Sequence, residues 1–187
     1  MRLFIGIGLP EAIRSRLASL SRSLAPSAPH ARWVDEPNLH LTLKFLGETA
    51  EESIDRLVDA MRTAAGCVGP FSMRLDRLGM FPSARRARVV WLGVSDGARE
   101  TTSLAKSLDL ELAPLGYRSE ARPFHPHITL ARLRVPEPLT GLAEDASEQP
   151  PPVDASVSVT HVTLFESRLR RTGAQYFVVE EVPLGSD

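Results

Sequence analysis

Two short segments of this sequence place a histidine and a threonine at the same spacing. Residues 40–43 read HLTL and residues 127–130 read HITL, so each has the order histidine, apolar residue, threonine, apolar residue. Imidazole is the side chain that can give or take a proton near neutral pH, and a hydroxyl can donate a hydrogen bond to an oxyanion. Two such pairs around one phosphodiester would supply a base, an acid and donors to the phosphoryl oxygens.

Both segments are predicted to lie in β-strands. Side chains alternate between the two faces of a strand, so His40 and Thr42 share one face about 6–7 Å apart, while Leu41 and Leu43 share the other. The chain has five histidines, and two of them recur in this arrangement, which favours a function over chance. A third copy, HVTL at 161–164, lacks the basic and turn residues that follow the first two, and we interpret its histidine as a structural strand residue.

The elements around these strands predict an α+β fold. Apolar periodicity gives the order strand, helix, strand, helix, strand, strand, helix and three strands, with antiparallel strands covered by helices on one side. Thr49 and Glu52 form a predicted capping box for the second helix. Gly116 is the predicted C-terminal stop of the third helix, which runs from about residue 97 to 115. The polar, Pro-rich stretch 136–152 is predicted to be a loop with one helical turn at most.

Composition limits the kinds of partner and compartment. The 187 residues are 43% apolar and carry a formal net charge of −1, so contact with nucleic acid requires a local basic patch. The single cysteine, Cys67, excludes an internal disulfide and a multi-cysteine zinc site, and it fits a reduced, cytoplasmic compartment. No run approaches 18 apolar residues, so we expect no membrane span.

Longer stretches around the two motifs resemble the 2H phosphoesterase superfamily, and more narrowly its LigT-like RNA 2′,3′-cyclic phosphodiesterases, first described as 2′-5′ RNA ligases. The stretches that carry the resemblance are RLFIGIGLP, WVDEPNLHLTLKFLGE, FPSARRARVVWLGV, RPFHPHITLAR and LFESRLRRTGAQY. The resemblance implies that residues 1–187 form a single domain of two similar lobes. Each lobe is expected to have an antiparallel sheet with covering helices, and the two motifs to face each other across a central groove.

The resemblance also implies a reaction. LigT-like enzymes open a terminal 2′,3′-cyclic phosphate on RNA to a 2′-phosphomonoester without metal or cofactor, and members can join or cleave 2′-5′ linkages. The expected partners are therefore RNA 3′ ends with a cyclic phosphate, such as tRNA fragments, or small cyclic nucleotides. We expect this protein to be a monomer.

Roles for individual residues follow from the matching positions. His40 and His127 are the expected catalytic residues, with His40 as the acid and His127 as the base. Thr42, Thr129 and Arg132 are expected to bind phosphate, and Phe45 to lie beside the terminal nucleotide.

The residues themselves suggest further contacts with RNA. His125, two before His127, and the basic pair Arg85 and Arg86 are candidate substrate-binding residues, because a chain without net positive charge needs local arginine to hold phosphates. Trp33 and Trp91 are predicted to lie in the core instead.

Two other functions stay open. A metal-dependent phosphohydrolase would use the motif histidines as zinc ligands, although threonine is a poor ligand and no cysteine or acidic residue completes a set in the HITL segment. An RNA-end binding module without catalysis would keep the same histidines as contacts only.

Overall fold

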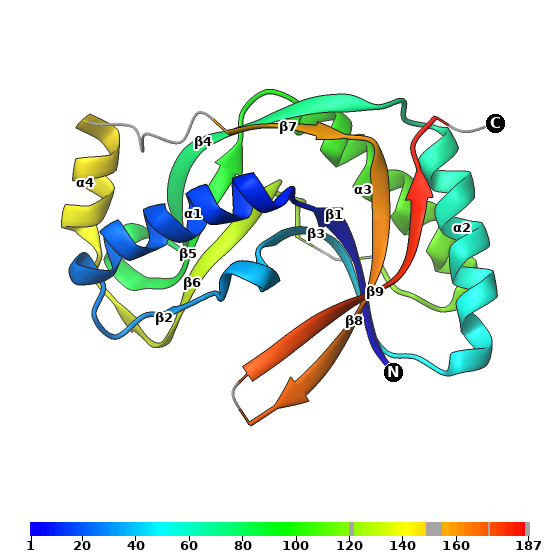
Figure 1. Cartoon of the computed structure of the whole chain (residues 1–187), viewed down its shortest axis with the longest axis horizontal. Coiled ribbons are helices and arrows are strands. Elements are labelled where there is room, and N and C mark those ends of the chain that lie inside the picture. Colours follow the sequence, from blue (N-terminus) through cyan, green and yellow to red (C-terminus); the bar gives the residue numbers. More distant parts are fainter. Residues whose placement is uncertain (120–121, 149–154, 172, 186–187) are drawn as a thin grey trace.

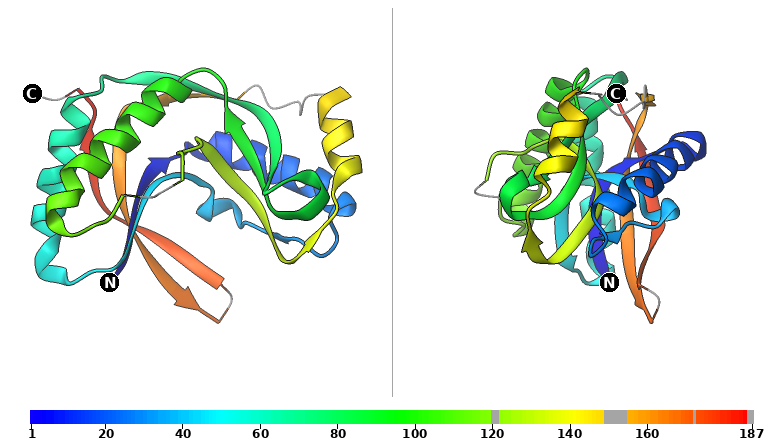
Figure 2. Two further views of the ribbon diagram at one scale, coloured as in Figure 1. Left: turned by 180° about the vertical axis from the view of Figure 1, so that it is seen from behind. Right: turned by 90° about the vertical axis from the view of Figure 1, so that its left-hand side faces the viewer.

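A computed structural model of the chain contains one nine-stranded antiparallel sheet that curls into an arch (Figures 1 and 2). It describes residues 1–119, 122–148, 155–171 and 173–185. The helices are α1 (Glu11–Leu24), α2 (Ile54–Gly66), α3 (Ala98–Leu112) and α4 (Thr140–Glu148). The strands are β1 (Arg2–Gly8), β2 (Arg32–Trp33), β3 (His40–Glu48), β4 (Phe71–Phe81), β5 (Ala87–Val94), β6 (His127–Glu137), β7 (Ala155–Val159), β8 (His161–Arg170) and β9 (Gly173–Pro183).

The sheet has two halves that meet at the two motif strands. The strand order is β7-β4-β5-β6-β3-β1-β8-β9, with β2 added beside β6, and β3 pairs with β6 through Leu41 and Ile128. The α+β fold of antiparallel strands and covering helices is confirmed. The two expected lobes correspond to the halves of this sheet, which is continuous instead of two separate sheets.

Two helices pack on the half of the sheet that does not contain the strand they follow, whereas α2 and α4 stay with the half of the preceding strand. Helix α1 follows β1 but contacts β6, and α3 follows β5 but contacts β3. Figure 1 shows α2 and α3 together at one end of the arch and α1 with α4 at the other. This exchange ties the two halves together, so the motif strands at the centre are supported from both sides.

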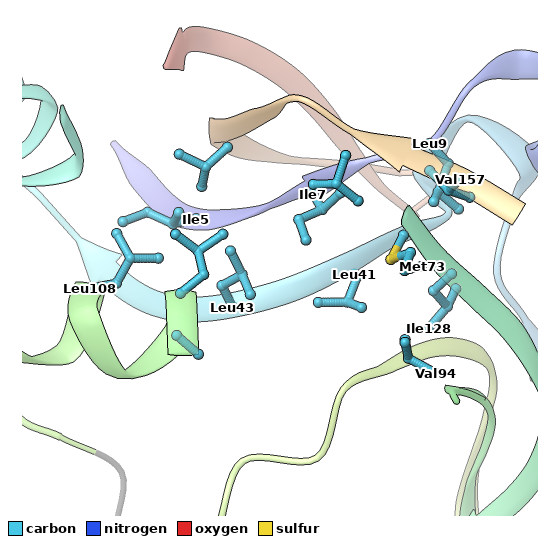
Figure 3. Close-up of a cluster of buried hydrophobic side chains, with 14 of the residues drawn as sticks. Ile5, Ile7, Leu9, Leu41, Leu43, Met73, Val94, Leu108, Ile128 and Val157 are labelled. Carbon is cyan, nitrogen blue, oxygen red and sulfur yellow. The ribbon is translucent and has the colours of Figure 1, made fainter. Parts of the chain in front are cut away.

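One hydrophobic core runs behind the motif strands. Figure 3 shows it extending from Leu108 of α3, through Ile5 of β1 and Leu41 of β3, to Ile128 of β6 and Val157 of β7. All five side chains are almost fully buried. Burial of each such side chain contributes about 1.5–3 kcal/mol, so the strands that carry the histidines are held by the best-packed part of the molecule.

The capping-box prediction was wrong. Helix α2 begins at Ile54, after a short 3₁₀ turn at Glu51–Ser53, and has no side-chain cap. Thr49 is buried, and its hydroxyl donates to the carbonyl of Gly47 at 3.3 Å. The N-terminal amine of Met1 donates to the Thr49 carbonyl at 2.7 Å, which ties this residue to the end of the sheet instead of the helix.

The predicted loop after the second motif was also wrong. Strand β6 continues to Glu137, and α4 follows at Thr140–Glu148. Leu139 and Leu142 are buried in a second, smaller core with Met80, which gives this helix an apolar face to pack. The last predicted loop residues, from 149, lie outside the described residues. Gly116 does end the third helical segment, with φ +91 in the left-handed region that glycine favours.

Candidate active site

The two motif strands share one pattern of burial. From His40 to Leu46 and from His127 to Leu133, the residues run half-buried, buried, half-buried, buried, buried, exposed, buried. The half-buried positions are the two histidines and the two threonines, whereas Leu41 and Ile128 face the core. The four motif side chains therefore share one face of the sheet, which we call the histidine face.

The pairing of β3 with β6 brings the two histidines together. Leu41 lies opposite Ile128 in an antiparallel pair, so the register sets His40 across from Thr129 and Thr42 across from His127. His40 and His127 are then diagonal neighbours, and in a regular antiparallel pair such residues lie about 7–8 Å apart. The positive charge of His127 also lowers the pKa of His40, after the larger effect of burial, as expected for neighbouring imidazoles.

A surplus residue in each strand turns the fifth residue after the histidine onto the same face. In β3, Thr42 pairs with Gly6 and Lys44 with Ile5, so Leu43 is one residue too many. In β6, Leu130 is surplus in the same way, between Thr129 and Ala131. Such a bulge reverses the side-chain alternation that follows it.

Without these bulges, Phe45 and Arg132 would point into the core. With them, Phe45 is 60% exposed, and its ring lies 6.2 Å from that of Phe4 on the histidine face. Arg132 is exposed and lowers the pKa of both motif histidines, although burial lowers each pKa more. Both residues thus lie on the same face as the motif histidines and threonines.

Both imidazoles are anchored through the same nitrogen. Nδ1 of His40 lies 2.7 Å from the carbonyl oxygen of Asn38, and Nδ1 of His127 lies 2.6 Å from that of His125. A carbonyl only accepts hydrogen bonds, so Nδ1 of each ring carries the proton and donates it. This leaves Nε2 of each ring for proton transfer, and in His40 that nitrogen lies 2.8 Å from the Thr42 hydroxyl.

Burial keeps both imidazoles poised toward the neutral form. Desolvation is the largest cause that lowers the pKa of His40 and of His127, and the charge of Arg132 lowers both further. The carbonyl hydrogen bonds from Nδ1 oppose this shift, because they favour the charged ring. A neutral Nε2 is a proton acceptor, so the free protein has a base ready on the histidine face.

Aromatic side chains that sequence reasoning missed surround His40. Its ring centroid lies 4.8 Å from that of Phe4, 5.1 Å from Tyr176 and 5.9 Å from Phe165. These residues come from β1, β9 and β8, which only the sheet order brings beside β3. The motif spacing carried no signal for them, although the stretch LFESRLRRTGAQY includes two of the three.

A second aromatic group lies beside His127. The ring of Phe81 lies 5.2 Å from His127, and that of Trp91 lies 6.0 Å away. Trp91, which we expected in the core, is half-buried on the histidine face. The indole of Trp91 packs directly on two glycines. A Cβ at Gly79 would overlap the indole, and a Cβ at Gly93 would lie 2.7 Å from its Cζ3, so neither position has room for a side chain.

The other candidate residues have different positions. The His125 carbonyl holds His127, while its own exposed ring lies 6.0 Å from that of Phe81. Arg85 and Arg86 are exposed in a 3₁₀ turn before β5. Seven residues separate Arg86 from Gly93, the partner of His127, which is about 23 Å along a strand. The ring of His125 therefore lies near that of His127, whereas Arg85 and Arg86 lie away from His127, three to four residues along the chain from Val89, the partner of Arg132.

The third copy of the motif does not join the first two. His161 is exposed at the start of β8, where its Nδ1 lies 2.8 Å from the hydroxyl of Thr160. Across the described ranges, no three side chains of His, Cys, Asp or Glu gather as they would around a metal ion. The helices in those same ranges are also too short or too polar to cross a membrane.

Comparisons with known proteins identify the family of this chain. A sequence model of the 2′-5′ RNA ligase superfamily matches residues 9–171. A protein of Escherichia coli K12 named RNA 2′,3′-cyclic phosphodiesterase is 37% identical over 183 residues, which cover 94% of this chain and 92% of that one. One of the same name from Methanothermobacter thermautotrophicus is 32% identical over 96% of this chain and 97% of its own.

Solved structures agree over the whole length. A protein of Thermus thermophilus superposes with a TM-score of 0.80 at 31% identity and covers all of both chains. E. coli LigT complexed with 3′-AMP has a TM-score of 0.75 at 34% identity and covers 98% of this chain and 97% of that one. With a family match that spans most of its length and relatives that align from end to end, the chain belongs to the 2′-5′ RNA ligase superfamily.

Proposed function

We propose that this protein hydrolyses the 2′,3′-cyclic phosphate at RNA 3′ ends to a 2′-phosphomonoester, with His40 and His127 as an acid–base pair and without a metal ion. One observation carries the proposal. Two imidazoles on adjacent strands are anchored by the same nitrogen to the carbonyl two residues earlier, and both present Nε2 on one face of the sheet.

The proposed reaction uses each Nε2 once. His127, as the neutral base, takes a proton from water while the water oxygen bonds to phosphorus. The bond from phosphorus to the 3′ oxygen breaks, and His40, as the protonated acid, gives its Nε2 proton to that oxygen. The products are a 2′-phosphomonoester and a 3′ hydroxyl. Each proton transfer of this kind contributes roughly 10²- to 10⁴-fold to the rate.

The neighbouring side chains fit the charge and shape of this substrate. Thr42 and Thr129 would donate to the non-bridging oxygens, where negative charge develops, and Arg132 would hold the same oxygens with its guanidinium. Phe45 is an exposed ring on the same face, suited to stacking on the terminal nucleobase. The names of the curated relatives, RNA 2′,3′-cyclic phosphodiesterase, and the 3′-AMP complex of E. coli LigT support this substrate class.

The proposal extends to the setting of the reaction. We propose a monomer in the cytoplasm, acting on RNA fragments such as those of tRNA or on small cyclic nucleotides. Reversible joining of RNA through 2′-5′ linkages is part of the proposal, since reversal exchanges the acid and base roles of the two histidines.

An assay in EDTA tests the proposed reaction. An oligonucleotide that ends in a 2′,3′-cyclic phosphate is incubated with the chelated protein, and the phosphomonoester isomer is identified. We expect the 2′ isomer at full rate, with activity abolished in His40→Ala and His127→Ala. Activity that returns only with added zinc would favour the metal-dependent phosphohydrolase. Tight binding of the cyclic end without any turnover would favour the RNA-end binding module.

A further inference from the structure

The hairpin of β8 and β9 extends beyond the rest of the sheet. Strand β1 pairs with β8 only over Leu3–Gly6, opposite Thr163–Glu166, so the later residues of β8 pair with β9 alone. Figure 1 shows this two-stranded ribbon projecting from the arch without a covering helix. We call residues 167–171 and 173–176 the ribbon.

The ribbon is the continuation of the histidine face. Phe165 and Ser167 pair with Val178 and Tyr176, so these side chains lie on the face that carries Phe4 and His40. Tyr176 packs its ring against His40 at 5.1 Å. The carbonyl of Ala174 accepts a hydrogen bond of 2.7 Å from the side chain of Asn38, whose own carbonyl anchors His40. A strand of RNA that leaves the site on the His40 side would therefore meet the ribbon next.

The ribbon carries a cluster of positive charge, although the chain as a whole has no net positive charge. Arg168, Arg170 and Arg171 lie within four residues, whereas the whole chain has a net charge of −1. Arg168 is held by Glu166, with Nη2 at 2.7 Å from the carboxylate, and lies over the ring of Phe177. Arg170 and Arg171 are exposed toward the end of the ribbon.

The same ribbon also exposes apolar surface. Leu169 is 72% exposed, and Val178, just beyond the ribbon on the same face, is 58% exposed. Leu169 and Val178 lie on the histidine face, whereas alternation places Arg168 and Arg170 on the opposite face of the ribbon. Single-stranded RNA offers unstacked bases beside a line of phosphates, so it would match bases on the apolar face and phosphates at the end of the ribbon that carries the arginines.

We propose that the ribbon binds the RNA strand on the 5′ side of the cyclic phosphate, with Arg170 and Arg171 on its phosphates. This inference rests on the proposed function for the identity of the RNA end. It gives the enzyme a preference for oligonucleotides over mononucleotides, because a nucleoside 2′,3′-cyclic phosphate has no further phosphates for Arg170 and Arg171 to hold.

The proposed role of the ribbon is tested by measuring RNA binding and hydrolysis of a small substrate in separate experiments. The paired variant Arg170→Gln/Arg171→Gln is titrated against a fluorescent oligonucleotide that ends in a 3′-phosphate, which has no ring to hydrolyse. We expect affinity to fall roughly tenfold near 0.1 M salt. The slope of log K against log salt should flatten by about 1.4, because each phosphate of a single strand that the protein neutralises adds about 0.7 to that slope. Hydrolysis of a nucleoside 2′,3′-cyclic phosphate should be unchanged, since neither arginine touches the histidines.

The matched control removes two arginines elsewhere. Arg56 on α2 and Arg99 on α3 are both exposed, and Arg56→Gln/Arg99→Gln makes the same change in net charge. Equal reductions in RNA affinity in both paired variants would overturn the proposal, as would undiminished RNA binding in the ribbon variant. Absence of hydrolysis of the nucleoside 2′,3′-cyclic phosphate by the wild-type protein would refute the proposed function, and weaker binding of the oligonucleotide by the ribbon variant alone would still support the ribbon. If the ribbon variant also abolished self-association in gel filtration, the surface would belong to a second copy of the chain, and the proposal would fail.

Discussion

The substitution Gly79→Ala tests whether Trp91 positions the second half of the site. Gly79 pairs with Trp91, and a Cβ built there would overlap Cζ2 and Cη2 of the indole and lie 2.7 Å from Cε2. Overpacking of this kind costs about 1–3 kcal/mol, and for a chain of this size each kcal/mol lowers Tm by about 2–4 °C. We therefore expect Tm to fall by roughly 2–12 °C.

The same substitution should also slow the reaction. The indole contacts His127 and Phe81, at ring distances of 6.0 Å and 4.9 Å, so its displacement moves the proposed base. A shift of about 1 Å at a catalytic group can cost about 100-fold, which sets the upper limit for the decrease in kcat/KM. Thermal unfolding and hydrolysis of a nucleoside 2′,3′-cyclic phosphate measure the two effects.

Gly69→Ala is the matched control, because a Cβ at Gly69 meets nothing within 4 Å. A second check places Gly79→Ala in a Trp91→Leu background, where the smaller side chain leaves room for the methyl group. The double variant should be more stable than the sum of the two single effects, since the residues are in contact. If Gly79→Ala kept the Tm and the activity of the parent protein, the flat packing of Trp91 on the glycines would be refuted.

Three further predictions concern the two imidazoles and a buried ion pair. The pH profile of kcat/KM should be bell-shaped with its maximum below 6.5, because burial and, to a smaller extent, the charge of Arg132 lower the pKa of both His40 and His127 from 6.5. The variant Arg132→Gln should lower kcat/KM and move the maximum to higher pH. A maximum at the same pH in this variant would contradict the assigned effect of Arg132. The double variant His40→Ala/His127→Ala should be little slower in steady-state turnover than either single variant, because the two groups act as a unit. If the rate decrease of the double variant equals the product of the two single decreases, the histidines have separate roles. The side chain of Lys44 is 3% exposed and pairs with Asp109, which is 30% exposed. Asp109→Ala should lower the free energy of unfolding in urea by about 3–5 kcal/mol because it leaves a buried charge unpaired, and Lys44→Met should lower it much less because it removes that charge. Equal decreases in the two variants would show that burial of the lysine charge does not decide the result.

The strands and helices were predictable where apolar periodicity was regular. Leu41, Leu43 and their neighbours mark a strand with one buried face, and that strand indeed carries His40 and Thr42 on the other. Helix α4 was missed because its amphipathic signal is short and lies in a Pro-rich stretch, and only packing of Leu139 and Leu142 on the smaller core favours it.

The site was predictable only in part. The histidines and threonines follow from alternation within each strand. Strict alternation would have assigned Lys44 to the histidine face and Phe45 to the core, and the surplus Leu43 reverses both. Lys44 is instead buried, and it donates to the carbonyl of Arg118 at 2.6 Å. No pattern of hydrophobicity reveals that Leu43, between Thr42 and Lys44, is a surplus residue.

Contacts between distant strands were beyond sequence reasoning for a different reason. Phe4 and Tyr176 lie beside His40 because β1 is the neighbour of β3 and is followed by β8 and β9 in the sheet order, and that order depends on long connections. The expected contacts of Arg85 and Arg86 rested on charge alone, which carries no information on distance from the histidines.

The matching surplus residues make each motif strand dependent on its bulge and not on its length. A regular strand of the same length would turn Phe45 and Arg132 inward. A strand one residue shorter, without Leu43 or Leu130, would keep the existing pairs on either side of the bulge in register and leave Phe45 or Arg132 facing outward. A one-residue gap at these positions in an alignment of distant relatives is therefore compatible with an intact site, and a redesigned active site on this scaffold can use the shorter regular strand or the longer bulged one.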